Sequence, residues 1–154
     1  FDTSKVTDMS YMFSSSKVTI LDVSNFNTSN VTNMYAMFYR SQITTLDLSS
    51  FDTSNVTNMR DMFDGSKATT LDLSNFDTSK VTDMSNMFAD SVNLKTIYSS
   101  NKFNTDAVTS STEMFYDCTS LVGGSGTKYN LRYIDKTYAR IDGGTSNPGY
   151  FTAK

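Results

Sequence analysis

The chain has 154 residues, a formal net charge of −3, 38% hydrophobic and 19% charged residues, which fits one globular unit able to bury a core. It has no His, one Cys and one Glu, which excludes Ser-His and Cys-His catalytic pairs and a cysteine cluster for zinc. The negative charge, without clustered Lys and Arg, argues against nucleic-acid binding, and no apolar run is long enough to cross a membrane. We therefore predict a non-enzymatic protein that needs no cofactor, binds no nucleic acid and does not insert into a membrane through this segment.

A repeat of 25 residues dominates the chain, beginning at Phe1 and again at Phe26, Phe51 and Phe76. An altered fifth copy begins at Phe103. The same step relates Val6, Val31, Val56 and Val81; Met9, Met34, Met59 and Met84; and Phe13, Phe38, Phe63 and Phe88. A fixed period of this size predicts a solenoid, in which each copy buries the apolar side that its neighbour leaves bare.

The first pattern within a copy is Val-x-x-Met-x-x-Met-Phe, as in residues 31–38. Its spacing of i, i+3, i+6 and i+7 places the apolar side chains on one side of a helix of about two turns. The Thr-Ser-Asn that precedes it, residues 28–30, supplies side chains that can cap such a helix. We therefore predict a short helix in every copy.

The second pattern, as in Ile43-x-x-Leu46-x-Leu48, alternates at period two and predicts a short strand with one buried face. Stacked copies would pair these strands in a parallel ladder about 4.8 Å apart. The predicted fold class is α/β: a leucine-rich-repeat-like solenoid with short parallel strands on one face and short helices on the other. Phe63→Ala, central in the array, should cost about 3 to 5 kcal/mol, more than the same change at Phe115.

We divide the chain into residues 1–122, a solenoid of about five units of 25 to 27 residues, and residues 123–154, a C-terminal capping segment. The glycine-rich break at Gly123–Gly126 separates them, and the Tyr-rich, basic stretch that follows alternates like paired strands. A small β cap over the last core face is the interpretation we favour, with a docking surface as the alternative. Its candidate covering residues are Tyr129, Leu131, Tyr133, Ile134, Tyr138 and Ile141.

The joined motif, Leu-x-x-Leu-x-Leu followed by F-D-T-S-N-V-T-N-M-x-x-M-F, resembles the BspA-like leucine-rich repeats, also called the bacterial surface protein 26-residue repeat family. The resemblance covers residues 1 to about 122, with two departures: units of 25 residues, and a Phe-x-x-Cys that survives only as Phe115-x-x-Cys118. It implies an extracellular location on a bacterial cell surface and a role in adhesion, without naming a ligand. Phe1 lies at a repeat boundary, so we expect a monomeric fragment of a longer chain.

The outward positions of the predicted strands form the candidate binding surface. They are Asp22, Asp47, Asp72 and Tyr98, flanked by Thr45 and Thr70. Carboxylates stacked at strand spacing repel one another, which invites a cation, a basic partner or donors from nearby Ser and Thr. We favour the last explanation over calcium, because Ca²⁺ usually needs six to eight oxygens converging on one point.

The leading hypothesis is a cell-surface recognition or adhesion module that binds a host or matrix protein or a glycan through the solenoid. The alternatives are a structural spacer or stalk that presents another domain, and a repetitive Thr/Ser/Asp face that binds a glycan, calcium or an ordered lattice. Near-identical copies favour the spacer, because selection for stacking alone would make the units alike. Distinct anchors that would favour recognition are few, namely Tyr98, Tyr35, Tyr39 and Arg40.

Overall fold

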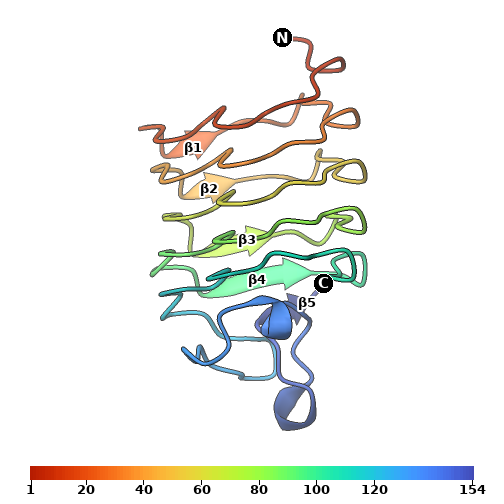
Figure 1. The fold of residues 1–154 in the computed structure, drawn as a ribbon. Coiled ribbons are helices and arrows are strands. Elements are labelled where there is room, and N and C mark those ends of the chain that lie inside the picture. The colour runs from red at the N-terminus through yellow and green to blue at the C-terminus, as the bar shows by residue number, and fades with distance from the viewer.

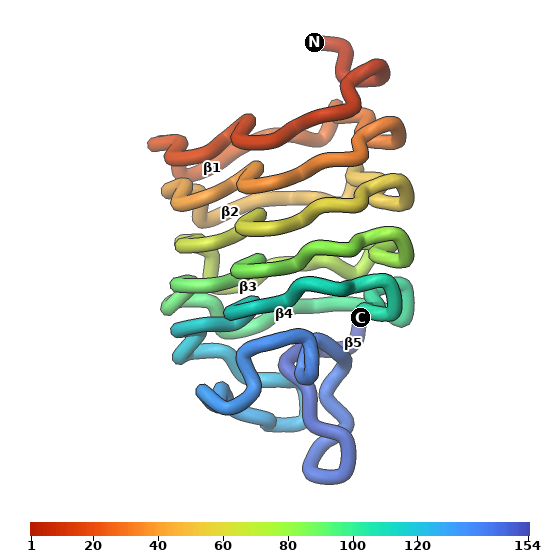
Figure 2. The backbone as a smooth tube through the Cα atoms, viewed as in Figure 1, coloured from red at the N-terminus to blue at the C-terminus, as the bar shows by residue number.

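The computed structural model describes residues 1–154 as a stack of similar coils that ends in the C-terminal segment (Figure 1). Each coil crosses the molecule, turns at the side and returns along a short strand (Figure 2). The strands are β1 (Ile20–Leu21), β2 (Thr45–Leu46), β3 (Thr70–Asp72), β4 (Thr96–Ser99) and β5 (Phe151–Ala153). Two 3₁₀ helices, η1 (Lys136–Tyr138) and η2 (Gly144–Ser146), lie near the C-terminus, and no helix is long and apolar enough to span a membrane.

The strands form two small parallel sheets. In the first, β1 pairs with β2, and Ile20 lies opposite Thr45. In the second, β3 pairs with β4 and β4 with β5, so that Thr70 lies opposite Thr96 and Ile97 opposite Phe151. The parallel pairing of equivalent segments one copy apart confirms that the copies stack, although the strands form two sheets and not one continuous ladder.

The predicted fold class, an α/β solenoid with helices on the face opposite the strands, is wrong. Residues 31–38 and their equivalents contain no α-helix. The N–H groups of Met34 and Phe38 donate to the carbonyl oxygens of Asn58 and Met62 in the next coil, both at 3.0 Å. The N–H of Met37 donates to the carbonyl oxygen of Met34 at 3.2 Å, which closes a turn three residues back and not a helical turn four residues back.

We call these stretches the turn segments: residues 9–16, 34–41, 59–66, 84–91 and 111–118. Each contains two residues in the left-handed region, such as Ala36 (φ 52°) and Arg40 (φ 49°), which interrupts any helix. A two-turn helix would bear the full cost of nucleation, whereas every second amide here bonds to the neighbouring coil. Backbone hydrogen bonding between copies therefore replaces the helix that the apolar spacing predicted.

The apolar pattern nevertheless faces inward as predicted. Val31, Met34, Met37 and Phe38 are each at most 2% exposed. Five phenylalanines, one from each coil, stack along the axis with ring centroids 5.5 to 5.8 Å apart and planes within 12° of parallel. They are Phe13, Phe38, Phe63, Phe88 and Phe115.

A row of buried threonines joins the coils along another edge. The hydroxyl of Thr53 donates to the carbonyl oxygen of Asp77 and accepts a hydrogen bond from the Asp77 N–H, each at 2.9 Å. Thr3, Thr28 and Thr78 make the same pair of bonds to the coil that follows each of them. The predicted helix cap at Thr28 therefore serves as a link between coils.

Residues 123–154 cover the last coil differently from the predicted β cap. The alternating stretch after Gly126 forms no pair of strands, and Leu131 in it is 64% exposed. Of the candidate covering residues, Tyr129, Tyr138 and Ile141 pack against the core as predicted. Tyr150 and Phe151 are fully buried beside them, and Tyr150 packs edge-on against Phe115 at 5.0 Å. Phe115 is thus as buried as Phe63, so we now expect substitutions at the two positions to cost equal amounts.

Asp142 holds the C-terminal segment together. Its carboxylate accepts hydrogen bonds from the N–H groups of Ser125, Thr127 and Gly144, each at 2.9 Å, and from the Thr127 hydroxyl at 2.8 Å. Burial opposes its ionisation, but these bonds outweigh burial and lower the pKa of Asp142 to about 2.

Candidate functional site

The carboxylates predicted to bind a ligand on the strand side are engaged by their own coils. Oδ1 of Asp22, Asp47 and Asp72 accepts a hydrogen bond from the N–H two residues ahead, at 2.9 to 3.0 Å. The hydroxyl and N–H of Ser24 hold the pKa of Asp22 below its ordinary value, and Ser49 does the same for Asp47. These are the turn-forming bonds expected of Asp in loops, which agrees with the structural explanation of the row.

The C-terminal lysine occupies the end of this row. Partial burial of Asp72 is outweighed by hydrogen bonds from Lys154 and Ser74, so the pKa of Asp72 is lowered. The Lys154 ammonium forms a salt bridge with Asp72 Oδ2 and lies 5.3 Å from the ring centroid of Tyr98. Asp72 and Tyr98, two of the predicted site residues, are thus in contact with Lys154 of the same chain.

Of the other predicted residues, Thr45 and Thr70 are exposed at the first positions of β2 and β3. A shallow pocket of about 260 Å³ brings Asp47 and Asp72 together, and Asp22 does not line it. No group of three or more His, Cys, Asp or Glu side chains is placed to hold a metal ion. The strand side therefore offers isolated polar side chains and no converging set of oxygens.

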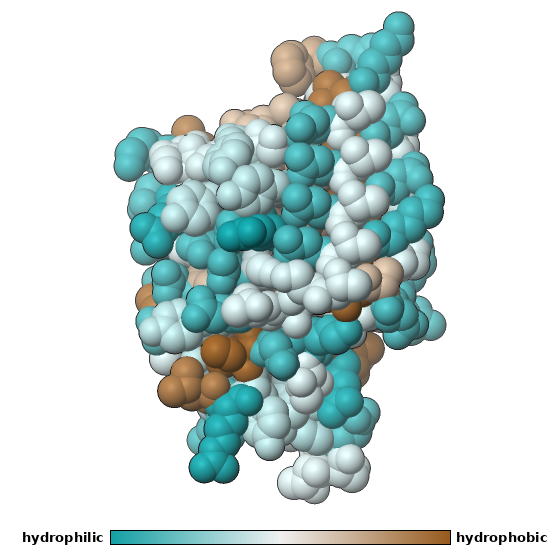
Figure 3. Space-filling model, viewed as in Figure 1, coloured by the Kyte–Doolittle hydropathy of each residue, from teal (hydrophilic) through white to brown (hydrophobic).

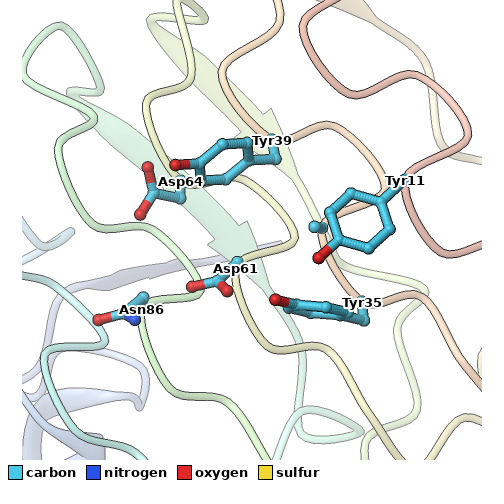
Figure 4. Close-up of a pocket in the computed structure, with 7 residues that line it drawn as sticks. Tyr11, Tyr35, Tyr39, Asp61, Asp64 and Asn86 are labelled. Atoms are coloured by element: carbon cyan, nitrogen blue, oxygen red, sulfur yellow. The ribbon is translucent and has the colours of Figure 1, made fainter.

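A more developed site lies on the turn segments, on the side of the coils away from the strands (Figure 4). A pocket of about 330 Å³ opens among seven residues from four consecutive coils. We call it the tyrosine–aspartate pocket; its lining residues are Tyr11, Tyr35, Ala36, Tyr39, Asp61, Asp64 and Asn86. Figure 4 shows the hydroxyl of Tyr39 directed toward Asp64 and that of Tyr35 toward Asp61.

Asp64 is the most unusual group in the pocket. The residue is 7% exposed, and its Oδ1 has no hydrogen-bond partner. The nearest cation is Arg40, whose Nε lies 3.6 Å from that oxygen, beyond ordinary hydrogen-bond length. Burial first, and then repulsion from Asp90, raise the pKa of Asp64 to about 6. The structure thus holds a poorly solvated carboxyl group at the pocket wall.

The other wall combines a second carboxylate with aromatic rings. Asp61 is 8% exposed, and its Oδ2 lies 3.4 Å from Nε of Arg60. The rings of Tyr11 and Tyr35 meet edge to face with centroids 4.9 Å apart. A hydrogen bond with Tyr11, followed by burial, raises the pKa of Tyr35 to about 12, so the phenol stays neutral.

Two arginines lie at the rim of the pocket. The Arg40 guanidinium lies 5.1 Å from the ring centroid of Tyr39 and reaches Asp90 at 3.7 Å. The Arg60 guanidinium lies 6.0 Å from the ring centroid of Tyr35. Their side chains remain 59% and 50% exposed, so both can move without disturbing the core.

Sequence reasoning missed this pocket, although Tyr35, Tyr39 and Arg40 had been noted as possible anchors. The sequence signal that could have indicated the pocket was the variation between copies. The Val, Met and Phe positions repeat without change in four copies, whereas the pair between the methionines reads Ser-Tyr, Tyr-Ala, Arg-Asp and Ser-Asn. The pair after Met-Phe varies as well: Ser-Ser, Tyr-Arg, Asp-Gly and Ala-Asp. The repeat thus keeps its Val, Met and Phe residues and changes the side chains between and after them in the turn segments.

Comparison with known families finds one match. The model of a family described as Mycoplasma protein of unknown function, DUF285, matches residues 1–99 and, in an overlapping second match, residues 41–147. Two overlapping matches to one model are what a chain built from similar copies produces. No curated protein and no solved structure matches the chain.

Proposed function

Because the chain belongs to the family described as Mycoplasma protein of unknown function, DUF285, whose description names no activity, we propose a function from the site itself. The chain acts as a non-enzymatic recognition module of a bacterial cell surface. It binds a host or matrix protein through the turn face, which we define as the outer side chains of the turn segments. The surface location rests on the resemblance of the repeat to BspA-like surface proteins.

The observation that carries this proposal is the strong variation between copies in the side chains of the turn segments. Stacking needs the buried Val, Met and Phe of the turn pattern, and these are constant in four copies, whereas another buried position changes from Ile43 to Ala68. The turn face instead gathers Tyr11, Tyr35, Tyr39, Arg40 and Arg60. Tyr and Arg are the residue types enriched among energetically important contacts in protein interfaces. A rigid stack of coils also presents such side chains without a large entropic cost of ordering.

The surface of this side suits a protein partner. Figure 3 shows it as pale or teal over most of its area, with brown limited to small patches. An interface of this kind relies on aromatic and charged anchors surrounded by polar side chains, and not on a broad apolar patch. The strand side supports recognition less well, because its carboxylates already bond to their own coils and to Lys154.

Substitutions borrowed from other copies provide the test. The fourth copy carries Ser85 and Ala89 where the second carries Tyr35 and Tyr39, so Tyr35→Ser with Tyr39→Ala should leave stacking intact. Fluorescently labelled chain would be applied to immobilised extracellular-matrix proteins and to cultured host cells. We expect the wild type to bind, and the double variant to bind at least about tenfold more weakly.

Asp47→Asn serves as the matched control on the strand side, because Asn also accepts the turn-forming hydrogen bond. It should bind like the wild type. Equal binding by the double variant, or loss of binding only in Asp47→Asn, would contradict the choice of face. Binding that disappears after glycosidase treatment of the target would show a glycan ligand and overturn the protein partner.

A structural spacer is the second candidate, and one observation favours it. The phenylalanine stack and the threonine row repeat in successive coils with little change, which is what selection for a stiff rod alone would produce. Failure of the correctly folded chain to bind any matrix protein or host cell would support the spacer and sink the recognition proposal.

A further inference from the structure

We propose that the tyrosine–aspartate pocket binds a primary alkylammonium group, the side-chain end of a lysine on the protein partner. The inference rests on the proposed function, because it names the chemistry that the turn face recognises. It is carried by three features that the pocket combines: a buried carboxylate oxygen without a hydrogen-bond partner, a second buried carboxylate, and three tyrosine side chains.

The polar atoms in the pocket call for a donor. Oδ1 of Asp64 lacks a hydrogen-bond partner, and a buried acceptor left unpaired is unfavourable. An ammonium has three N–H donors and no acceptor, so it can bond at once to a carboxylate and to the oxygens of two phenols. The hydroxyl of Tyr39 is directed toward Asp64 and that of Tyr35 toward Asp61, so each carboxylate has a phenol beside it (Figure 4).

The charges around the pocket leave room for one cation. Three carboxylates, those of Asp61, Asp64 and Asp90, face the two guanidinium groups of Arg40 and Arg60. This set carries one excess negative charge when all five groups are ionised. Burial and repulsion from Asp90 raise the pKa of Asp64 to about 6, which shows that the existing arginine does not fully compensate this carboxylate.

The aromatic walls favour an organic cation over a metal ion. Only two carboxylates line the pocket, and no cluster of three potential metal ligands exists in the structure. Ca²⁺ would need six to eight oxygens around one point, which this pocket does not supply. Tyrosine rings attract alkylammonium groups through their π faces and also cover the methylene stem of a lysine.

An arginine side chain on the partner suits the pocket less well than a lysine. Guanidinium groups already lie over the rings of Tyr39 and Tyr35 at the rim. A further guanidinium would compete with these two groups for the same rings. A compact ammonium needs no planar pairing and can approach Asp64, which lines the pocket.

The test is a titration of the isotope-labelled 154-residue chain, followed by amide chemical shifts at pH 7.5 and constant ionic strength. The probes are N-butylammonium chloride and Nα-acetyl-L-lysine amide, with the Nε-acetylated form of the latter as the uncharged control. We expect saturable shifts at Tyr35, Asp61 and Asp64 with a Kd of order millimolar for both charged probes, and none for the acetylated one.

The matched variants are Asp64→Asn and, as control, Asp47→Asn. Asp64→Asn removes one charge from the pocket and should weaken binding by about tenfold or more, while Asp47→Asn should not change it. The dispersed spectrum of each variant shows whether it is folded. Equal shifts from the acetylated probe, or unchanged affinity in folded Asp64→Asn, would overturn the inference.

The outcomes also separate this inference from the proposed function. Binding of the charged probes without binding to any matrix protein or host cell would support the pocket and contradict the recognition module. Binding to a target that survives in Asp64→Asn and in a target with acetylated lysines would support the module and overturn the lysine pocket.

Discussion

A substitution at Asp64 measures how much this buried carboxylate lowers the free energy of unfolding. The side chain is 10% exposed, so solvent screens its charge little. Its pKa is raised from 3.8 to about 6, chiefly because burial disfavours the charged form. Replacing it by Asn keeps the size and removes the ionisation, so Asp64→Asn should stabilise the chain at neutral pH.

The magnitude follows from the difference between folded and unfolded chains. A difference of about two pKa units, each worth about 1.4 kcal/mol, gives about 3 kcal/mol. Because the folded pKa is the higher one, the penalty is absent below about pH 4. It develops as the pH rises from about 4 to about 6 and is complete at pH 7.5. Asp64→Asn should thus gain about 2 to 3 kcal/mol relative to the wild type between pH 4 and pH 7.5.

Urea denaturation followed by circular dichroism at pH 4 and pH 7.5 measures this gain. The quantity to compare is the free energy of unfolding of the variant minus that of the wild type at each pH. Asp47→Asn is the control, because the pKa of Asp47 is lowered by Ser49, and it should show no gain at pH 7.5. The same difference at both pH values would refute the buried, undercompensated carboxylate.

Three further predictions concern the stack and its C-terminal segment. Phe63→Ala should lower the free energy of unfolding by about 3 to 5 kcal/mol, and Phe13→Ala by less because Phe13 is only half-buried; equal losses in urea denaturation would contradict this. The low pKa of Asp142 should contribute about 2 kcal/mol above pH 4 that is lost as the pH falls to about 2, so Asp142→Asn should lack this part of the acid unfolding seen by circular dichroism. Glu113→Gly should raise the free energy of unfolding by about 0.5 to 1 kcal/mol because Glu113 has φ 55°, whereas Thr112→Gly beside it should lower it, and thermal melts of both variants decide the point.

Only part of the candidate sites could be predicted from the sequence. Asp22, Asp47, Asp72 and Tyr98 were predicted as outward positions because period-two alternation assigns faces within one strand. The tyrosine–aspartate pocket was not predicted, because its residues come from four coils and their convergence depends on how turn segments stack. Only a comparison between copies, position by position, could have indicated it.

The amino-acid sequence by itself determined the register of the stack and the identity of the core. A constant step of 25 residues between identical apolar side chains leaves one way to bury them all, which is to place each copy on the next. The spacing of apolar residues could not distinguish a helix from a series of turns, because both place residues 31, 34, 37 and 38 on one side. Tertiary structure decided it, since N–H groups such as that of Met34 find carbonyl partners only when the neighbouring coil is present.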